Sequence, residues 1–177
     1  MSELQIRNTI STDLARLGKI DHTIQSEYVW QLDLRREPGQ VDAIFREVRL
    51  PRSVQIDHPR PAAELSDIWH TSPMLTAMLK NEAIGYIRFS DQMIPHGVWI
   101  TDVVVARDLR RNGIARKLIA AAQAWSAQKG LQRTIIETQS KNYPAIRMFY
   151  KLGFEFCGYN DIYYSTRDIA LFFSRPI

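Results

Sequence analysis

Hydrophobic and polar positions are most clearly ordered in the second half of the chain. Residues 98–105 form a nearly unbroken apolar run, which is typical of a central strand covered on both faces. Before it, residues 74–79 and 83–89 flank a short polar segment and predict an antiparallel hairpin. After it, residues 114–129 carry apolar side chains at helical spacing and stop at Gly130, so they predict a helix.

The rest of this half continues the alternation of strands and helices. Residues 143–152 predict a helix with Pro144 in its first turn, where the missing N–H costs little. A strand–helix–strand unit favours parallel pairing, whereas the preceding hairpin is antiparallel. We therefore expect an α/β (α+β) fold with one mixed central sheet flanked by helices. Its remaining strands are predicted at residues 133–139, 154–159 and 169–174.

The first half of the chain is less regular. Residues 4–10 predict a strand and residues 12–19 a helix. Residues 28–34 and 42–50 flank a turn containing Pro38 and Gly39 and predict a hairpin, although the second segment also fits a helix. Three prolines without periodicity predict an irregular surface loop at residues 51–61.

Length and composition point to one globular domain. The chain has 177 residues, of which 45% are hydrophobic and 24% charged. It contains no apolar run of about 18 residues, so we expect no membrane association. Its first residues lack the pattern of a secretory signal, and its single Cys157 cannot form an intramolecular disulfide. These features predict a cytoplasmic protein.

The basic residues of the chain are concentrated in one place, around Gly113. A net charge of +4 is compatible with nucleic-acid binding or with an anionic cofactor. The basic residues are dispersed except around Gly113, which favours a local anion site over a nucleic-acid surface. The four histidines show no metal-ligand spacing, so no metal is expected. The basic group consists of Arg107, Arg110, Arg111, Arg116 and Lys117.

The segment 110–115, Arg-Arg-Asn-Gly-Ile-Ala, opens the long predicted helix. The first turn of a helix has unpaired N–H groups and a positive dipole end, so it accepts phosphate readily. Gly113 and the small Ala115 would let a diphosphate approach the backbone. An ordinary basic first turn is the alternative. The chain contains neither G-x-x-x-x-G-K-[ST] nor G-x-G-x-x-G, which argues against a P-loop nucleotidase and a dinucleotide fold.

Three motifs in order resemble those of one known family. Residues 110–115 match the [RQ]-x-x-G-x-[GA] signature that follows a strand in GNAT acetyltransferases. Asn142-Tyr143-Pro144-Ala145 and the segment 149–154, Phe-Tyr-Lys-Leu-Gly-Phe, resemble the N-x-x-A and FY-x-x-x-GF elements of that superfamily, the second with one intervening residue fewer. The chain is thus similar to GNAT N-acetyltransferases over about residues 74–177.

A further set of residues looks like the streptothricin acetyltransferase branch. In that branch E-T-Q, N, A, F-Y, D, Y and [DE]-I-A recur in this order, and the same core also resembles protein N-terminal acetyltransferases. The first half of the chain gives no match. The matching residues are Glu137-Thr138-Gln139, Asn142, Ala145, Phe149-Tyr150, Asp161, Tyr164 and Asp168-Ile169-Ala170.

The resemblance implies a single GNAT domain over residues 1–177 with a splayed pair of central strands. Residues 73–177 would form the acetyl-CoA-binding core, and residues 1–72 a variable acceptor side. No metal is implied. The residues expected to hold acetyl-CoA are Val103, Val104, Val105, Arg110, Arg111, Asn112, Gly113, Ile114, Ala115, Arg116, Asn142, Ala145 and Tyr150.

Three side chains are candidates for catalysis. Glu137 lies mid-strand, where burial would raise its pKa, and the resemblance gives a Glu there the role of general base. Asp102 is the competing base, and strand alternation predicts that it shares a face with Ile100 and Val104. The resemblance places the phenol of Tyr150 near the coenzyme sulfur, as a general acid. Each of the three has a structural alternative, namely a hydrogen bond or simple packing.

The leading functional hypothesis is acetylation of a small-molecule amine, such as a streptothricin-type antibiotic. An acetyltransferase acting on protein N-termini or lysines is the second hypothesis, and a non-catalytic acyl-CoA-binding module is the third. A cationic acceptor would favour an acidic pocket, and a homodimer is compatible with exposed last strands. The acidic candidates are Glu27, Asp33, Asp102 and Asp161.

Overall fold

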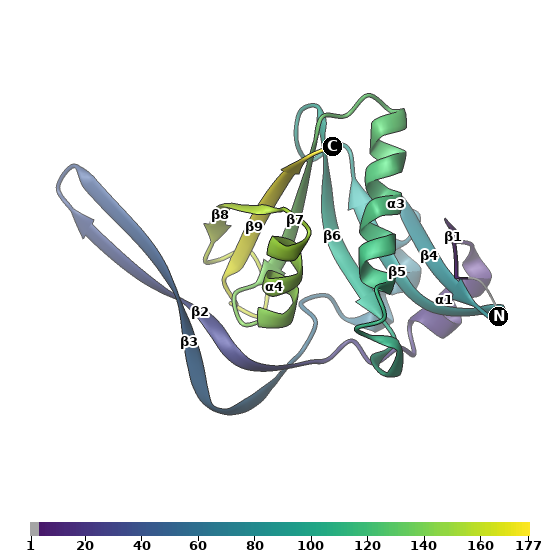
Figure 1. Ribbon diagram of the computed structural model, residues 1–177, viewed down its shortest axis with the longest axis horizontal. Coiled ribbons are helices and arrows are strands. Elements are labelled where there is room, and N and C mark those ends of the chain that lie inside the picture. The colour runs from purple at the N-terminus through teal and green to yellow at the C-terminus, as the bar shows by residue number, and fades with distance from the viewer. Residues whose placement is uncertain (1–3) are drawn as a thin grey trace.

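A computed structural model describes residues 4–177 as a seven-stranded sheet with helices on both faces, and a separate two-stranded ribbon (Figure 1). The strands of the larger sheet are β1 (Gln5–Asn8), β4 (Met74–Leu79), β5 (Glu82–Ser90), β6 (Gly97–Val105), β7 (Arg133–Gln139), β8 (Glu155–Asn160) and β9 (Ala170–Pro176). The ribbon consists of β2 (Ile24–Glu37) and β3 (Gln40–Ile56). The helices are α1 (Ser11–Leu17), η1 (Ala62–Glu64), α2 (Leu65–Ile68), η2 (Arg107–Leu109), α3 (Ile114–Gln128) and α4 (Tyr143–Lys151).

The strand order of the larger sheet is β1-β4-β5-β6-β7-β9-β8, with β6 and β7 parallel and the other neighbours antiparallel. The β6–β7 ladder joins only residues 97–100 to residues 133–136. Beyond Ile100, no ladder of the described residues connects the two strands, so they separate toward their carboxyl ends. This arrangement confirms the expected mixed sheet with a splayed central pair.

Two hydrophobic clusters cover the two faces of the sheet. On one face, Ile100 and Phe173 pack with Leu118 of α3 and Ile146 of α4. In Figure 1 these two helices lie in front of the sheet. On the other face, Tyr86 and Val104 are packed with Leu17 of α1 and Leu65 of α2. Side chains that alternate along β5 and β6 therefore enter one cluster or the other.

The predicted elements of the second half are confirmed within one or two residues at each end. In the first half the hairpin is confirmed, and the helical interpretation of residues 42–50 is wrong. The expected loop at residues 51–61 is wrong for its first six residues, because β3 continues to Ile56. Pro51 is tolerated there because it lies where the β2–β3 ladder is irregular, between the pairs Tyr28–Arg49 and Ser26–Val54.

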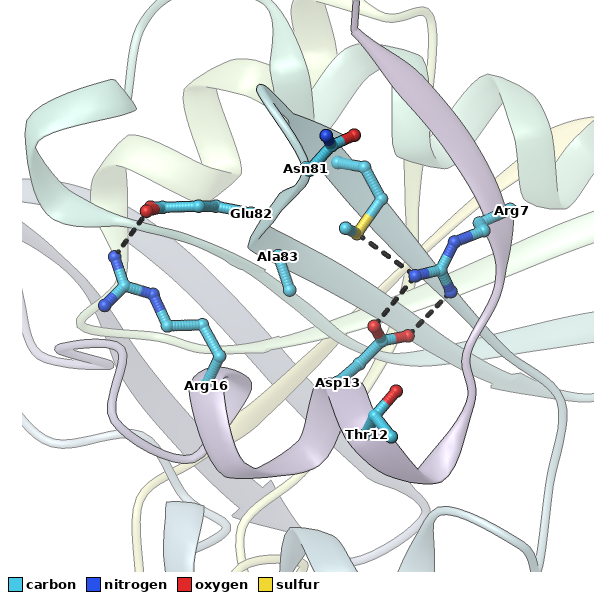
Figure 2. A pocket seen from close by; sticks show the side chains of 8 residues that line it. Arg7, Thr12, Asp13, Arg16, Asn81, Glu82 and Ala83 are labelled. Atoms are coloured by element: carbon cyan, nitrogen blue, oxygen red, sulfur yellow. Dashed lines mark hydrogen bonds and ion pairs between the residues drawn. The ribbon is translucent and has the colours of Figure 1, made fainter.

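A shallow cavity of about 340 Å³ lies where α1 meets the edge of the sheet. Figure 2 shows Arg7 of β1 and Asp13 of α1 pointing toward one another, with Nη1–Oδ2 and Nη2–Oδ1 distances of 2.7 and 2.8 Å. Arg16 reaches Glu82 across the same cavity. These charged groups pair among themselves and tie α1 to the sheet edge, so we assign them a structural role.

Candidate active site

The turn that opens α3 has the geometry expected of a phosphate site. Gly113 has a φ of 77°, a conformation that glycine adopts without strain. A Cβ at Gly113 would meet no atom within 4 Å, so the space beside this turn is open. Lys117 N–H is bonded to Gly113 O, whereas the preceding N–H groups of the first turn have no intrahelical acceptor.

The basic residues around this turn divide into two groups. Arg110 points inward, and its guanidinium donates to the backbone oxygens of Val105, Thr23 and Asp21. Burial lowers the pKa of Arg110. Arg111 and Arg116 are exposed, as are Asn112 and Gly113. Arg110 thus fastens the turn to the segment before β2, and the exposed arginines supply the charge.

The apolar end of β6 lies beside the region where β7 diverges. Val103 packs against the α3 cluster, whereas Val104 enters the α1 cluster on the opposite face. Their backbone pairs with β5 on one side, and no ladder of residues 4–177 occupies the side facing β7. Backbone groups of residues 103–105 are therefore available to a ligand strand on that side.

A β-bulge decides where Asp102 points. Arg88 pairs with Asp102 and Phe89 pairs with Ile100, so Thr101 is an extra residue in β6. Asp102 consequently lies on the face of Val104 and not on that of Ile100. The prediction that all three share one face is wrong, because strict alternation does not survive a bulge.

Asp102 is buried and surrounded by donors. Its Oδ1 lies 3.0 Å from Arg60 Nη1 and 3.4 Å from His58 Nε2. Its Oδ2 accepts from Arg88 Nε and from the Thr101 hydroxyl, both at 2.7 Å. Burial acts to raise the pKa of Asp102, but Arg60, His58 and Arg88 together hold this pKa below its usual value.

Glu137 on β7 is also buried, with a fully covered side chain. Its Oε1 accepts from Arg60 Nη2 and, at 3.4 Å, from the Tyr164 hydroxyl. Its Oε2 accepts from Trp99 Nε1 at 2.5 Å and from the Tyr163 hydroxyl at 2.7 Å. Burial and the charge of Glu137 raise the pKa of both tyrosines. Four donors therefore surround this carboxylate.

Arg60 links the two carboxylates, and no motif in the sequence singles it out. Burial opposes its charge, but Asp102 and Glu137 outweigh burial and raise the pKa of Arg60 above its usual value. Its partners lie 42 and 77 residues away in the chain. Arg88 and His58 were missed for the same reason, since only the fold places them beside Asp102.

A second shallow cavity, of about 420 Å³, borders this network. Arg60, Arg88 and Tyr163 of the network line this cavity, and the rest of its lining comes from the segments around η1 and Ser165. The complete lining is Pro59, Arg60, Pro61, Glu64, Ile68, Arg88, Tyr163, Tyr164 and Ser165.

The residues of α4 lie on the opposite side of the diverging strands. Asn142 is the N-cap of this helix, and its Oδ1 accepts from Ala145 N–H at 3.3 Å. Tyr150 is 42% exposed, and burial of part of its ring raises its pKa. Its ring contacts Trp30 and Phe173, with centroid distances of 5.7 and 5.5 Å.

The four acidic residues expected to form a cationic acceptor pocket do not form one group. Asp33 lies on the ribbon and pairs with Arg46, whereas Asp102 lies inside the sheet beside Arg60. Glu27 and Asp161 are exposed and line neither of the two cavities described above.

Comparison with known proteins supports the resemblance seen in the motifs. Residues 41–154 match the model described as "Acetyltransferase (GNAT) family". The chain is 33% identical over 81 residues to streptothricin acetyltransferase of Streptomyces lavendulae, covering 44% of this chain and 43% of that protein. The match thus spans less than half the length of this relative.

Solved structures share the whole fold at low sequence identity. A nourseothricin acetyltransferase is 21% identical, with a TM-score of 0.81 and 98% of each chain covered. A proposed streptothricin acetyltransferase from Bacillus anthracis str. Ames, in complex with acetyl coenzyme A, is also 21% identical. Its TM-score is 0.77, with 99% of this chain and 100% of that chain covered. The resemblance drawn from the sequence motifs is therefore confirmed.

Proposed function

Because the chain belongs to the acetyltransferase (GNAT) family, close to its streptothricin acetyltransferase branch, we propose that it acetylates a primary amine of a small molecule, with acetyl-CoA as the donor. The observation that carries this proposal is the position of the open turn at Gly113. It follows β6, the strand that leaves β7 at the centre of the sheet, with only the short η2 turn between them.

The described residues fit acetyl-CoA on both sides of the diverging strands. The unpaired N–H groups at Gly113, Ile114 and Ala115, with the exposed Arg111 and Arg116, suit the diphosphate. Backbone groups of Val103, Val104 and Val105 suit the amides of the pantetheine arm, and one N–H there would polarise the thioester carbonyl. From α4, Asn142 and Ala145 would border the arm.

The acceptor amine would enter through the cavity lined by Arg60, Arg88 and Tyr163. Each candidate base has a donor that lines this cavity, the Tyr163 hydroxyl for Glu137 and the Arg88 guanidinium for Asp102. Glu137 is favoured because its Tyr163 donor is neutral and easier for an ammonium to replace. An incoming ammonium could replace that hydroxyl at Oε2 and then pass its proton to Glu137. At Asp102 an ammonium would have to displace the charged Arg60 or Arg88, so this carboxylate serves better as an anchor for the two arginines.

Direct transfer then needs one further proton. The amine nitrogen forms a bond to the acetyl carbon, and the bond from that carbon to sulfur breaks. The sulfur leaves with the electron pair and takes a proton from the Tyr150 hydroxyl. The nitrogen of the new amide releases its surplus proton to solvent, from which the Tyr150 phenolate is reprotonated. A phenol is protonated at neutral pH, and burial raises the pKa of Tyr150 further, so it holds this proton until the thiolate forms.

A pH–rate comparison tests the base. Glu137→Gln should lower kcat/KM by roughly 100-fold or more, with the largest loss at low pH, where the acceptor is mainly protonated. Asp102→Asn should reduce stability and leave the shape of the pH profile unchanged. If Asp102→Asn alters the profile and Glu137→Gln does not, the roles of the two carboxylates are exchanged.

The substrate class is tested by thiol release from acetyl-CoA with a panel of amines. The panel contains streptothricin, an aminoglycoside, polyamines, lysine and short peptides with free N-termini. Turnover with a small-molecule amine supports the proposal, and the relatives favour streptothricin. Turnover with peptides alone would make the chain a protein acetyltransferase. If acetyl-CoA binds but no amine accelerates thiol release, the chain would be a non-catalytic binding module.

A further inference from the structure

The β2–β3 ribbon forms its own sheet (Figure 1). It is attached to the body of the protein, the seven-stranded sheet with its helices, by a short aromatic seam in which two side chains of β2 contact two side chains of α4. Trp30 N–H donates to Ser140 O at 2.9 Å, immediately after β7. The Tyr28 and Tyr143 rings are 4.8 Å apart, and the Trp30 and Tyr150 rings 5.7 Å apart. Beyond this seam, Figure 1 shows the ribbon running away from the body.

The spacing of the four aromatic residues of the seam brings one face of β2 against one face of α4. Tyr28 and Trp30 are two residues apart on a strand, so their side chains point the same way. Tyr143 and Tyr150 are seven residues apart on a helix, which places them on the same side two turns from each other. The ribbon therefore contacts both ends of α4, at Tyr143 near the start of the helix and at Tyr150 near its end.

Ring packing is what orients the Tyr150 phenol. None of the hydrogen bonds among residues 4–177 includes its hydroxyl, and the side chain is 42% exposed. Its aromatic neighbours are Trp30, at an interplanar angle of 36°, and Phe173, at 87°. Phe173 is fully buried in the core, whereas Trp30 is half-buried and belongs to the ribbon. Trp30 is thus the one neighbour that a movement of the ribbon would displace.

We propose that Trp30 is a positioning residue, which holds the Tyr150 phenol in the orientation needed to protonate the leaving thiolate. The inference rests on the proposed function, in which Tyr150 is the general acid. A small displacement of a catalytic group costs up to about 100-fold in rate. The ribbon, which lies in the half of the chain without motif matches, thereby takes part in the reaction through Tyr150.

A double-mutant cycle between Trp30 and Tyr150 tests this proposal. Trp30→Ala should lower kcat by roughly 10- to 100-fold and leave the Kd of acetyl-CoA unchanged. In a Tyr150→Phe background the same substitution should have little further effect, because there is no phenol to position. Trp30→Phe should restore most of the rate. Tyr28→Ala, which removes the other contact of the same seam, is the matched control and should retain kcat. The acceptor is streptothricin or the fastest amine of the panel.

An acceptor-independent measurement follows the same contact. The difference in ultraviolet absorbance between each variant and its Tyr150→Phe counterpart reports ionisation of the Tyr150 phenol alone. Trp30→Ala should move the pKa of Tyr150 down toward the ordinary tyrosine value, and Tyr28→Ala should not.

Two results would overturn the proposal. Equal losses of kcat from Trp30→Ala in both backgrounds would make Trp30 merely structural, and an unchanged kcat and Tyr150 titration would remove any role. Full activity of Tyr150→Phe alone is a separate failure. It would show that the assignment of the general acid is wrong, and the positioning role would fall with it.

Discussion

Arg60 shares one guanidinium between Asp102 and Glu137, two carboxylates that the sheet buries side by side. Two buried anions without a shared cation would repel each other and lose most of their hydration. The half-buried loop before η1 supplies this cation, which explains how the sheet tolerates both acids at the point where its central strands separate. The two carboxylates in turn hold Tyr163 and Arg88 in the lining of the cavity.

Removing this cation should be costly. Arg60→Met should lower the free energy of unfolding by about 3–5 kcal/mol, because it leaves two buried charges without their common partner. Urea denaturation measures the change. Arg46→Met is the matched control: Arg46 pairs with Asp33 on the exposed ribbon and should cost at most about 1 kcal/mol. Equal effects of the two substitutions would contradict this account of Arg60.

His22 should make the protein less stable in mild acid. Burial, followed by the neighbouring His58, lowers the pKa of His22 from 6.5 to about 4. Below pH 6.5 the unfolded chain therefore binds a proton at His22 that the folded chain refuses, and stability falls as the pH drops toward 4. Thermal melting between pH 7 and 4 should show a smaller decrease for His22→Phe. His70→Phe, at an exposed position, is the control; equal slopes for the two variants would contradict the prediction.

At the scale of elements, α3 carries a glycine with positive φ at each end. Gly113 and Gly130 have φ values of 77° and 72°, and a Cβ at either would meet no atom within 4 Å. Substitution by Leu should therefore cost a similar amount of stability at both, about 1–2 kcal/mol of backbone strain. Gly113→Leu should in addition weaken acetyl-CoA binding at least about tenfold, and Gly130→Leu should not. Calorimetric titration measures the acetyl-CoA affinity of the two variants. Equal affinities for Gly113→Leu and Gly130→Leu would show that the diphosphate binds elsewhere.

The elements with one dominant pattern were predictable from the sequence. The apolar run at residues 98–105 and the helical spacing at residues 114–129 correspond closely to β6 and α3. The length of β3 was not predictable, because prolines normally interrupt strands and only pairing with β2 carries it past Pro51. The direction of Asp102 depends on a bulge, which alternation cannot show.

In the candidate site, too, some residues were predictable from local motifs and others were not. Gly113 and Asn142 belong to local motifs that were recognisable from residues close in the chain. The structure adds that Gly113 has a positive φ and that Asn142 caps α4. Arg60, Arg88 and Trp30 act through partners on other elements, with no local signal in the sequence. Such contacts arise only when the sheet brings β5, β6 and β7 together and the ribbon is fastened to α4.

At the scale of the whole molecule, the ribbon is the part least tied to the core. Trp30 and Phe45 pack against the main cluster, whereas Val41 and Ile44 farther along are exposed. Isolated two-stranded ribbons are only marginally stable in water, so its anchoring depends on the seam at α4. No helix of the described residues is long and apolar enough to span a membrane.

Shortening the ribbon tests whether its far end is independent of the core. Replacing residues 33–44 with Asn-Gly would join Leu32 to its cross-strand partner Phe45. The melting temperature should stay within about 4 °C, because none of the removed residues packs in either core cluster. A larger fall would show that the distal ribbon is covered in solution. Sedimentation of the full-length protein and of the shortened variant would then test whether the protein is a homodimer, which stays a prediction.

Direct transfer of an acetyl group from acetyl-CoA to an amine is the central claim, and a single-turnover experiment with radiolabelled acetyl-CoA tests it most directly. The enzyme in excess would be mixed with labelled acetyl-CoA, with and without streptothricin, and the label followed in protein and small molecule. The account predicts that label enters an amide of the acceptor, at a rate that depends on the acceptor, with none on the protein. Label on the protein, or acetyl-CoA left unchanged by any amine of the panel, would contradict it.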